Sequence, residues 1–390
     1  MRKKRNAHKK RDIFFTAFLL MAILICMGWA ATGNSFGSRK NQGEISEAAE
    51  NINNNNLKEN QKMISKPMEI PKSYKEELDD QNKIDAVISI PENIREKGFR
   101  QAWGQKSFPD RETMLQLFGE YDLYEGEEYK NVEQYRGADN MYLYYPRIEE
   151  EGFSAITDFA MLVRSAFRNQ VGVPNFNRDK YVKEGNLGNF TLEECREILK
   201  ELSRDIGMGD SVSMTCYALD YQTMSEEAML LDMDGNITKP DHRWSDSDNC
   251  FYCEISQLCN GIPVISASDV MGAADIIECG EVDCIIKKDR IADLSFSNIY
   301  SISYSENYEE LLSFDEILQR YRDMLESREM VYQTCITDIT MRVLPTADGG
   351  DRYKMHPVWV FYGHDSTEVE GELMEGPYAV FFDGVTGDIL

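Results

Sequence analysis

The sequence predicts an α+β fold: two helix-on-antiparallel-sheet halves that follow an N-terminal transmembrane helix and a disordered linker. Three observations predict it. An uncharged apolar run lies near the N-terminus, and a polar stretch without periodicity follows it. The remainder contains one order of elements twice: a capping box, an amphipathic helix and a strand with Thr-Cys. A helix packed across an antiparallel sheet buries its single apolar face, so two such units make a stable body.

The N-terminal segment has the length and charge pattern of a membrane anchor. Residues 1–11 form a basic tail with seven Lys and Arg, and residues 12–31 contain the apolar run. A helix over residues 13–31 would be roughly 28 Å long, close to the hydrocarbon thickness of a bilayer. The basic residues place the tail in the cytoplasm, and Trp29 lies where interfacial aromatic residues are common. We therefore expect a single-pass protein of the cell membrane with an extracellular C-terminal body.

Two alternatives to a permanent anchor remain open. Cleavage as a signal peptide would follow Ala30, although such peptides have a shorter apolar core of about 7–15 residues. Lipoprotein processing would use Cys26, but Ile25 stands where that processing needs a small residue. All three routes export the rest of the chain.

Residues 32–90 are predicted to be a disordered linker. They are rich in Asn, Lys, Glu, Gln and Ser, and they hold too little apolar surface to offset the entropy of ordering. A flexible coil of this length has a root-mean-square span of roughly 40–45 Å. The body would therefore stand away from the membrane, within reach of other surface proteins.

The charge balance argues against a nucleic-acid-binding protein. The chain has a net charge of −26, and beyond residue 31 it holds 35 basic and 67 acidic residues, or −32. Such a surface repels phosphate backbones and anionic lipid head groups. We expect no nucleic-acid partner, and contact with the membrane only through the N-terminal helix.

The first part of the body is predicted to cover residues 91–310. Asp110 is expected to cap a helix that runs to Phe118, and residues 141–145 (MYLYY) are expected to form a strand that ends before Pro146. Residues 156–167 fit either a helix or a strand, because their apolar spacing favours the first and their β-branched and aromatic content allows the second.

The repeat defines a first half at about residues 190–305 and a second at residues 311–390. Thr191 and Ser313 each begin an S/T-x-x-E capping box, in which the hydroxyl and the carboxylate satisfy free amides of the first turn. The helices that follow lead into strands at 211–221 and 330–344, which contain Cys216 and Cys335. Further strands are expected at 229–233, 251–257, 263–266, 357–362 and 378–382.

Two phrases of the sequence resemble a known family. Residues 356–361 (HPVWVF) with 378–390 (YAVFFDGVTGDIL) resemble the closing strands of PepSY-like modules. Residues 256–264 (SQLCNGIPV) are similar to an element of the anchored YycH/YycI-type proteins of Gram-positive bacteria. Those proteins carry one N-terminal transmembrane helix before a body of PepSY-like halves, and the layout also resembles uncharacterised clostridial membrane families. The resemblance covers roughly residues 190–390.

The resemblance implies a non-enzymatic accessory at the cell surface that binds another membrane or surface protein and regulates a sensor kinase or a peptidase. It names no catalytic, cofactor-binding or metal-ligating residue. Two other classes stay open: an exported hydrolase that uses carboxylates, and a structural envelope protein.

The cysteines are the main candidates for chemistry. Eight lie beyond the apolar run: Cys195, Cys216, Cys250, Cys253, Cys259, Cys279, Cys284 and Cys335. The C-x2-C pair at Cys250 and Cys253 has the spacing of a redox or metal pair, and Cys259 and His242 are the nearest further ligands. If residues 251–257 form a strand, Cys250 lies on the face opposite Cys253, which spoils a compact site. Small buried thiols, disulfides and a metal or redox site all remain open.

Other motifs carry little chemistry. The Asp232-x-Asp234-Gly235-Asn236 run lacks the spacing of a calcium loop and fits a hairpin turn better. The single G-x-S-x-G lies at residues 33–37 with neither the strand nor the helix that a nucleophile elbow needs. His356 and His364 are expected at the surface. Aromatic clusters such as residues 142–145 and 359–362 are expected in the core, and exposed aromatics on a sheet edge would suit a partner that adds a strand.

Overall fold

The computed structural model describes residues 69–119, 121–124, 132–137, 140–146, 152–167, 177–231, 236–266, 280–327, 333–369 and 372–390. The chain divides into two units, residues 1–65 and 66–390, and all described residues belong to the second. The predicted basic tail, the anchor and the linker up to residue 68 therefore lie outside the described residues. Within the described ranges, no helix combines the length and the apolar character that crossing a bilayer requires.

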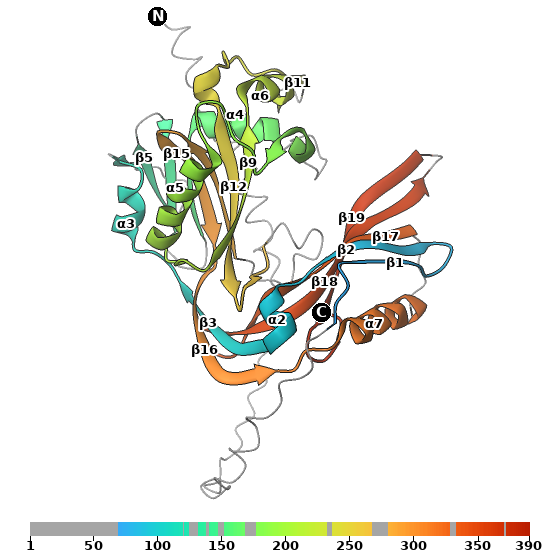
Figure 1. Ribbon diagram of the computed structural model, residues 1–390. Coiled ribbons are helices and arrows are strands. Elements are labelled where there is room, and N and C mark those ends of the chain that lie inside the picture. Colours follow the sequence, from blue (N-terminus) through green and yellow to red (C-terminus); the bar gives the residue numbers. More distant parts are fainter. Residues whose placement is uncertain are drawn as a thin grey trace, which may run out of the picture. The chain divides into compact units, whose positions relative to one another are not determined.

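The described body is mostly β, so the predicted α+β fold of two PepSY-like, helix-on-sheet halves is wrong. Its strands form one sheet of ten strands, one of seven and a separate small hairpin, and six α-helices accompany them in the described ranges (Figure 1). The prediction failed because many strands come from segments in which charged residues obscure the alternation of apolar and polar positions. Examples are residues 73–107 and 281–309, for which no strand was expected.

The ten-stranded sheet has the order β4-β5-β6-β7-β15-β14-β12-β9-β8, with β13 paired to β12, and every pair is antiparallel. Its strands are β4 (Tyr121–Tyr124), β5 (Val132–Gly137), β6 (Tyr142–Pro146), β7 (Phe153–Ile156), β8 (Val182–Lys183), β9 (Val212–Leu219), β12 (Cys250–Cys259), β13 (Ile262–Pro263), β14 (Glu281–Lys287) and β15 (Arg290–Ser297). The separate hairpin pairs β10 (Leu230–Leu231) with β11 (Ile237–Thr238), and the residues of its predicted turn, 232–235, lie outside the described ranges.

Helices cover both faces of this sheet. On one face, α3 (Arg111–Gln116) and α5 (Leu192–Asp205) pack into a core that includes Leu199 and Phe251. On the other face, α4 (Asp158–Phe167) and α6 (Tyr221–Glu227) pack against Tyr252. The short 3-10 helices Asn177–Lys180 and Asp246–Asp248 complete this part of the fold.

The seven-stranded sheet has the order β1-β2-β17-β18-β3-β16, with β19 also paired to β18. Its strands are β1 (Ser73–Glu77), β2 (Asn82–Ser89), β3 (Phe99–Ser107), β16 (Ile299–Glu309), β17 (Gln333–Ala347), β18 (Arg352–Val369) and β19 (Glu372–Asp383). Only β2 and β17 run parallel. The helices α2 (Glu92–Lys97) and α7 (Phe314–Ser327) pack on one face, where Ile94 and Tyr321 join the core.

The predicted linker is wrong for its last part, because β1 and β2 lie inside residues 32–90. Strand β2 alternates strictly, and Ile84, Ala86 and Ile88 point into the core between exposed neighbours. The sheet also takes β3 and β16 from before residue 311, so the strands around the second predicted half do not come from residues 311–390 alone.

Several local predictions are confirmed. Thr191 begins a capping box in which its hydroxyl accepts from the Glu194 amide, and Ser313 makes the same contacts with Glu316. Asp110 caps α3 through the Thr113 amide. The ambiguous segment 156–167 is a helix from Asp158 onward.

The segment at residues 256–264 lies where the two sheets meet. Cys259 pairs with Ile262, so Asn260-Gly261 is a two-residue hairpin turn, and both residues have positive φ. Beyond the turn, Val264 forms a bridge with Val343 of β17. Strand β12 therefore lies in the ten-stranded sheet and ends in the core of the seven-stranded sheet, which contains Cys259.

Candidate functional site

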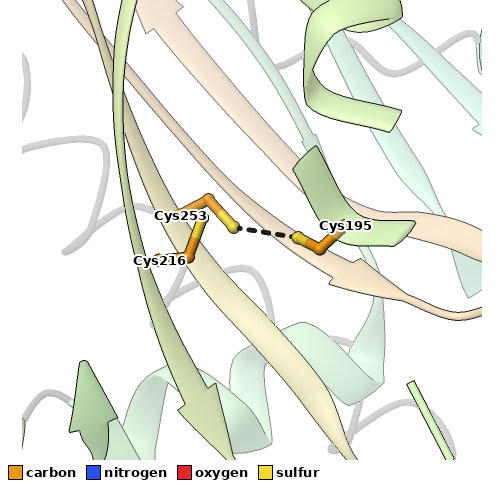
Figure 2. Close-up of side chains that lie close together, drawn as sticks. All are labelled: Cys195, Cys216 and Cys253. Carbon is orange, nitrogen blue, oxygen red and sulfur yellow. Dashed lines mark hydrogen bonds between the residues drawn. The ribbon is translucent and has the colours of Figure 1, made fainter. Parts of the chain in front are cut away.

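The most distinctive group of reactive side chains is a buried cluster of thiols. The sulfur atoms of Cys195, Cys216 and Cys253 all lie within 4.8 Å of one another, and the Cys195 and Cys253 sulfurs are 3.6 Å apart. Figure 2 shows how the three side chains point toward one another from separate elements. We call these three residues the thiol cluster.

Sheet register and helix periodicity produce this convergence. Cys253 on β12 lies directly opposite Cys216 on β9 and, on its other side, opposite Cys284 on β14. Residues directly opposite each other share one face of a sheet, so the three strands present a row of thiols. Cys195 lies on the buried stripe of α5 with Leu199, and that stripe packs on the same face of the sheet.

The cluster is closed to solvent and surrounded by apolar groups. Cys195, Cys216, Cys253 and Cys284 are all 0% exposed. Burial, together with hydrogen bonds to the other thiols, raises the pKa of Cys253. Hydrogen bonds from Cys195 and Cys253 lower the pKa of Cys216, and the same contact with Cys216 raises the pKa of Cys195.

The ligand set suggested by spacing is not brought together. Cys250 belongs to the core on one face of β12 and Cys253 to the core on the other, as strand alternation requires. Cys259 lies in the core of the seven-stranded sheet. The Nε2 atom of His242 lies 3.3 Å from Asp248 instead. The seven described cysteines are all free, and six of them are buried.

Sequence reasoning did not identify Cys195 and Cys216 as neighbours of Cys253. Ligands from one turn or hairpin leave a short spacing in the sequence, whereas these three come from a helix and two strands. Only the strand register and the docking of α5 place them together.

A second polar group lies on the opposite face of the sheet. Arg164 of α4 bonds to Asp283 on β14 and to Asp293 on β15, and the exposed fractions of these side chains are 17%, 11% and 1%. Desolvation acts against the charged guanidinium, but the two carboxylates outweigh it and raise the pKa of Arg164. The group joins a helix to two neighbouring strands.

Asp248 is the centre of a third polar group. Its carboxylate accepts from the Ser245 amide and lies 3.8 Å from the Lys287 amino group. Cys250 is opposite Lys287 in the sheet, but burial raises the pKa of its thiol. A thiol held in its neutral form is a poor nucleophile, so this group does not resemble an activated catalytic cysteine.

The outer edge of β16 is one of the open edges of the seven-stranded sheet. Its inner side pairs with β3, and no described strand pairs with its outer side. The Gln257 side chain bonds to both the N–H and the C=O of Tyr300. By the two-residue alternation of antiparallel pairing, the backbone groups of Ile302 and Tyr304 face the same way, away from β3. Tyr304 and Tyr308 are 40% and 55% exposed.

A small hollow with about 180 Å³ of empty space lies near this edge, and its lining includes Gln257, Val282 and Ile299.

Comparisons with known proteins inform the fold. No family model and no curated protein matches the sequence. Among solved structures, the chain is similar to an uncharacterised protein from Eubacterium rectale ATCC 33656. The match has a TM-score of 0.60 and 15% identity, and it covers 82% of this chain and 93% of that chain. At this identity the likeness concerns the fold alone.

Proposed function

We propose that this protein is a non-enzymatic accessory of the cell surface, anchored by its N-terminal segment, that binds and regulates another membrane or surface protein. A membrane sensor or a peptidase is the kind of partner that the family resemblance implies. The observation that carries the proposal is the outer edge of β16, with its outward backbone groups and its two exposed tyrosines.

The chemistry of this edge suits a partner that adds a strand. Residues 299–305 (IYSISYS) are uncharged, whereas natural edge strands are commonly short or protected by charge and proline. Outward amide and carbonyl groups give affinity to an added strand, and exposed tyrosines give contact area with few side-chain torsions to freeze. The register shift between Tyr304 and Tyr308 ends the regular edge. The added strand would therefore be short and lie along residues 302–304, because the outward backbone groups of Tyr300 already bond to Gln257.

Crosslinking in intact cells tests the proposal. A photoreactive residue at Tyr304 or Tyr308 is expected to capture one surface protein, identified by mass spectrometry. Val182, which is 65% exposed on β8 of the other sheet, is the matched control site. Capture of nothing specific at the two tyrosines, or of the same proteins at Val182, would contradict the proposal.

A pair of substitutions separates strand addition from simple ring contact. Both Tyr304→Ala and Tyr304→Pro remove the ring, but only the proline also removes the outward N–H. Strand addition predicts that Tyr304→Pro reduces capture at Tyr308 much more than Tyr304→Ala does. Equal capture by the two variants, with unchanged thermal unfolding, would show that the partner does not pair with β16.

A further inference from the structure

The thiol cluster has features that neither a surface accessory nor ordinary core packing requires. A buried cysteine packs as a small apolar side chain, and such residues need no particular spacing from one another. Here, the three cysteines come from three different elements, and their sulfurs all lie within 4.8 Å of one another. We propose that these three residues form a closed three-thiolate site for a thiophilic d10 metal ion, of the zinc(II) or copper(I) class.

The sulfur separations agree with metal coordination. Zinc–thiolate bonds are about 2.3 Å long, so two sulfurs bound to one ion lie roughly 3.8 Å apart in a tetrahedral arrangement. The Cys195 and Cys253 sulfurs are 3.6 Å apart, and Cys216 lies within 4.8 Å of both. The third sulfur needs to move by about 1 Å at most to reach this separation from the other two.

The ligand chemistry selects the class of ion. Thiolates are soft donors and favour copper(I) and zinc over hard cations such as magnesium or calcium. The surroundings are apolar, and the described residues within 4.8 Å of all three sulfurs add no His, Asp or Glu ligand. A metal ion would also offset the cost of burying thiolates, because it compensates their negative charge directly.

The position of Cys284 determines whether the site has three or four sulfur ligands. It lies next to Cys253 in the row, on the side away from Cys216. Neighbouring strands are about 4.8 Å apart, so the backbones at Cys216 and Cys284 are separated by roughly twice that distance. Their sulfurs cannot both reach one ion without a shift of the sheet. We therefore assign three ligands, with Cys284 as a neighbour.

The experiment uses the full chain, purified in detergent under reducing, oxygen-free conditions and freed of metal by a chelator. Titration with cadmium(II), a spectroscopic substitute for zinc, is expected to produce thiolate-to-metal charge-transfer absorbance that saturates at one equivalent. Zinc(II) and copper(I), each added with a competing chelator, then show which ion binds more tightly. Binding is also expected to release protons, because cysteine coordinates a metal ion as the deprotonated thiolate.

Substitutions locate the ligands. Cys195→Ser, Cys216→Ser and Cys253→Ala are each expected to lose the saturable signal while keeping a cooperative thermal unfolding transition. Cys250→Ala, on the other face of β12, and Cys284→Ser are matched controls that should retain it. If a ligand variant does not fold, protection of the wild-type cysteines from alkylation by bound metal provides the same information by peptide mapping.

Several outcomes would overturn the proposal. One is the absence of a charge-transfer signal with all three ions. The others are a full signal in folded Cys216→Ser and loss of the signal in Cys284→Ser. A disulfide between two cluster cysteines in protein purified without reductant would also overturn it, because the cluster would then be a cystine site. Loss of partner capture at β16 has no bearing on these results, so failure of the two proposals can be distinguished.

Discussion

Replacing Arg164 by Met is expected to lower the free energy of unfolding by about 3–5 kcal/mol, the usual cost of removing one partner from a buried ion pair. Arg164 compensates two carboxylates at once, and the side chains of Asp283 and Asp293 are only 11% and 1% exposed. Methionine fills much of the same volume but leaves both charges in an apolar region between α4 and the sheet.

A second substitution checks the electrostatic origin of the loss. In the Arg164→Met background, Asp293→Asn removes the more deeply buried of the two carboxylate charges that Arg164 had paired with, and it should recover about half of the lost stability. Urea unfolding monitored by circular dichroism measures the effect. With an m-value of about 3 kcal/mol/M, the midpoint of Arg164→Met should fall by roughly 1–1.7 M.

The control is an ion pair of similar distance at the surface. Arg204 lies 2.6 Å from Asp210, but their side chains are 57% and 78% exposed. Arg204→Met should therefore have a much smaller effect on the free energy of unfolding than Arg164→Met. An Arg164→Met protein as stable as Arg204→Met, or no recovery in the double variant, would refute the reasoning.

Three further predictions concern the capped helix, the hairpin at the joint between the sheets, and a partly buried histidine. Ser313→Ala should cost about 1 kcal/mol in urea unfolding, because the first-turn amide of Glu316 loses its acceptor. Gly261→Ala should cost about 1–2 kcal/mol by the same measurement, since φ at this position is +77°. Burial, and then the neighbouring charge of Lys354, lower the pKa of His356 below its usual value of 6.5. The unfolded chain therefore binds the proton more readily, and stability should fall as pH drops below about 6.5. His356→Gln should reduce the loss of melting temperature between pH 7.5 and pH 5.

Each of these predictions has a control in the same chain. Ser327→Ala, at the other end of α7, should have a smaller effect than Ser313→Ala, and an equal loss would argue against capping. Gly188→Ala, where an added methyl group meets nothing within 4 Å, should be tolerated, so equal costs at Gly188 and Gly261 would contradict the turn argument. His364→Gln at an exposed position should keep the wild-type pH dependence, and a flat profile in that variant would remove His356 as the cause.

Local sequence signals were reliable where the interaction joins residues only a few positions apart. The capping boxes at Thr191 and Ser313 and the cap at Asp110 depend on a hydroxyl or carboxylate three residues from an amide, which the sequence states directly. The Asp383-Gly384 turn is of the same kind, because the Asp383 carboxylate accepts from the amides of Val385 and Thr386.

Strand prediction failed where charge hid the alternation. Strand β2 reads NKIDAVIS, and its lysine and aspartate made the segment resemble the polar stretch before it. Its apolar positions nevertheless alternate, and they face a core whose other side is provided by α7 and by strands more than 200 residues away. The C-x2-C spacing suggested a metal or redox pair, but strand alternation correctly predicted that the two thiols separate. Within a strand, three residues of separation put Cys250 and Cys253 on opposite faces.

The sequence alone determined the acidic balance of the chain, the capped helices, the turns and the alternation that separates Cys250 from Cys253, because each depends on neighbours within a few positions. The tertiary structure decided which strands share a sheet, how the Asn260-Gly261 hairpin joins the two sheets, and which thiols meet. Cys195, Cys216 and Cys253 become neighbours only through the register of β9 against β12 and the packing of α5 across them. Register and packing are set by the burial of whole faces, which is a sum over distant residues that no local pattern contains.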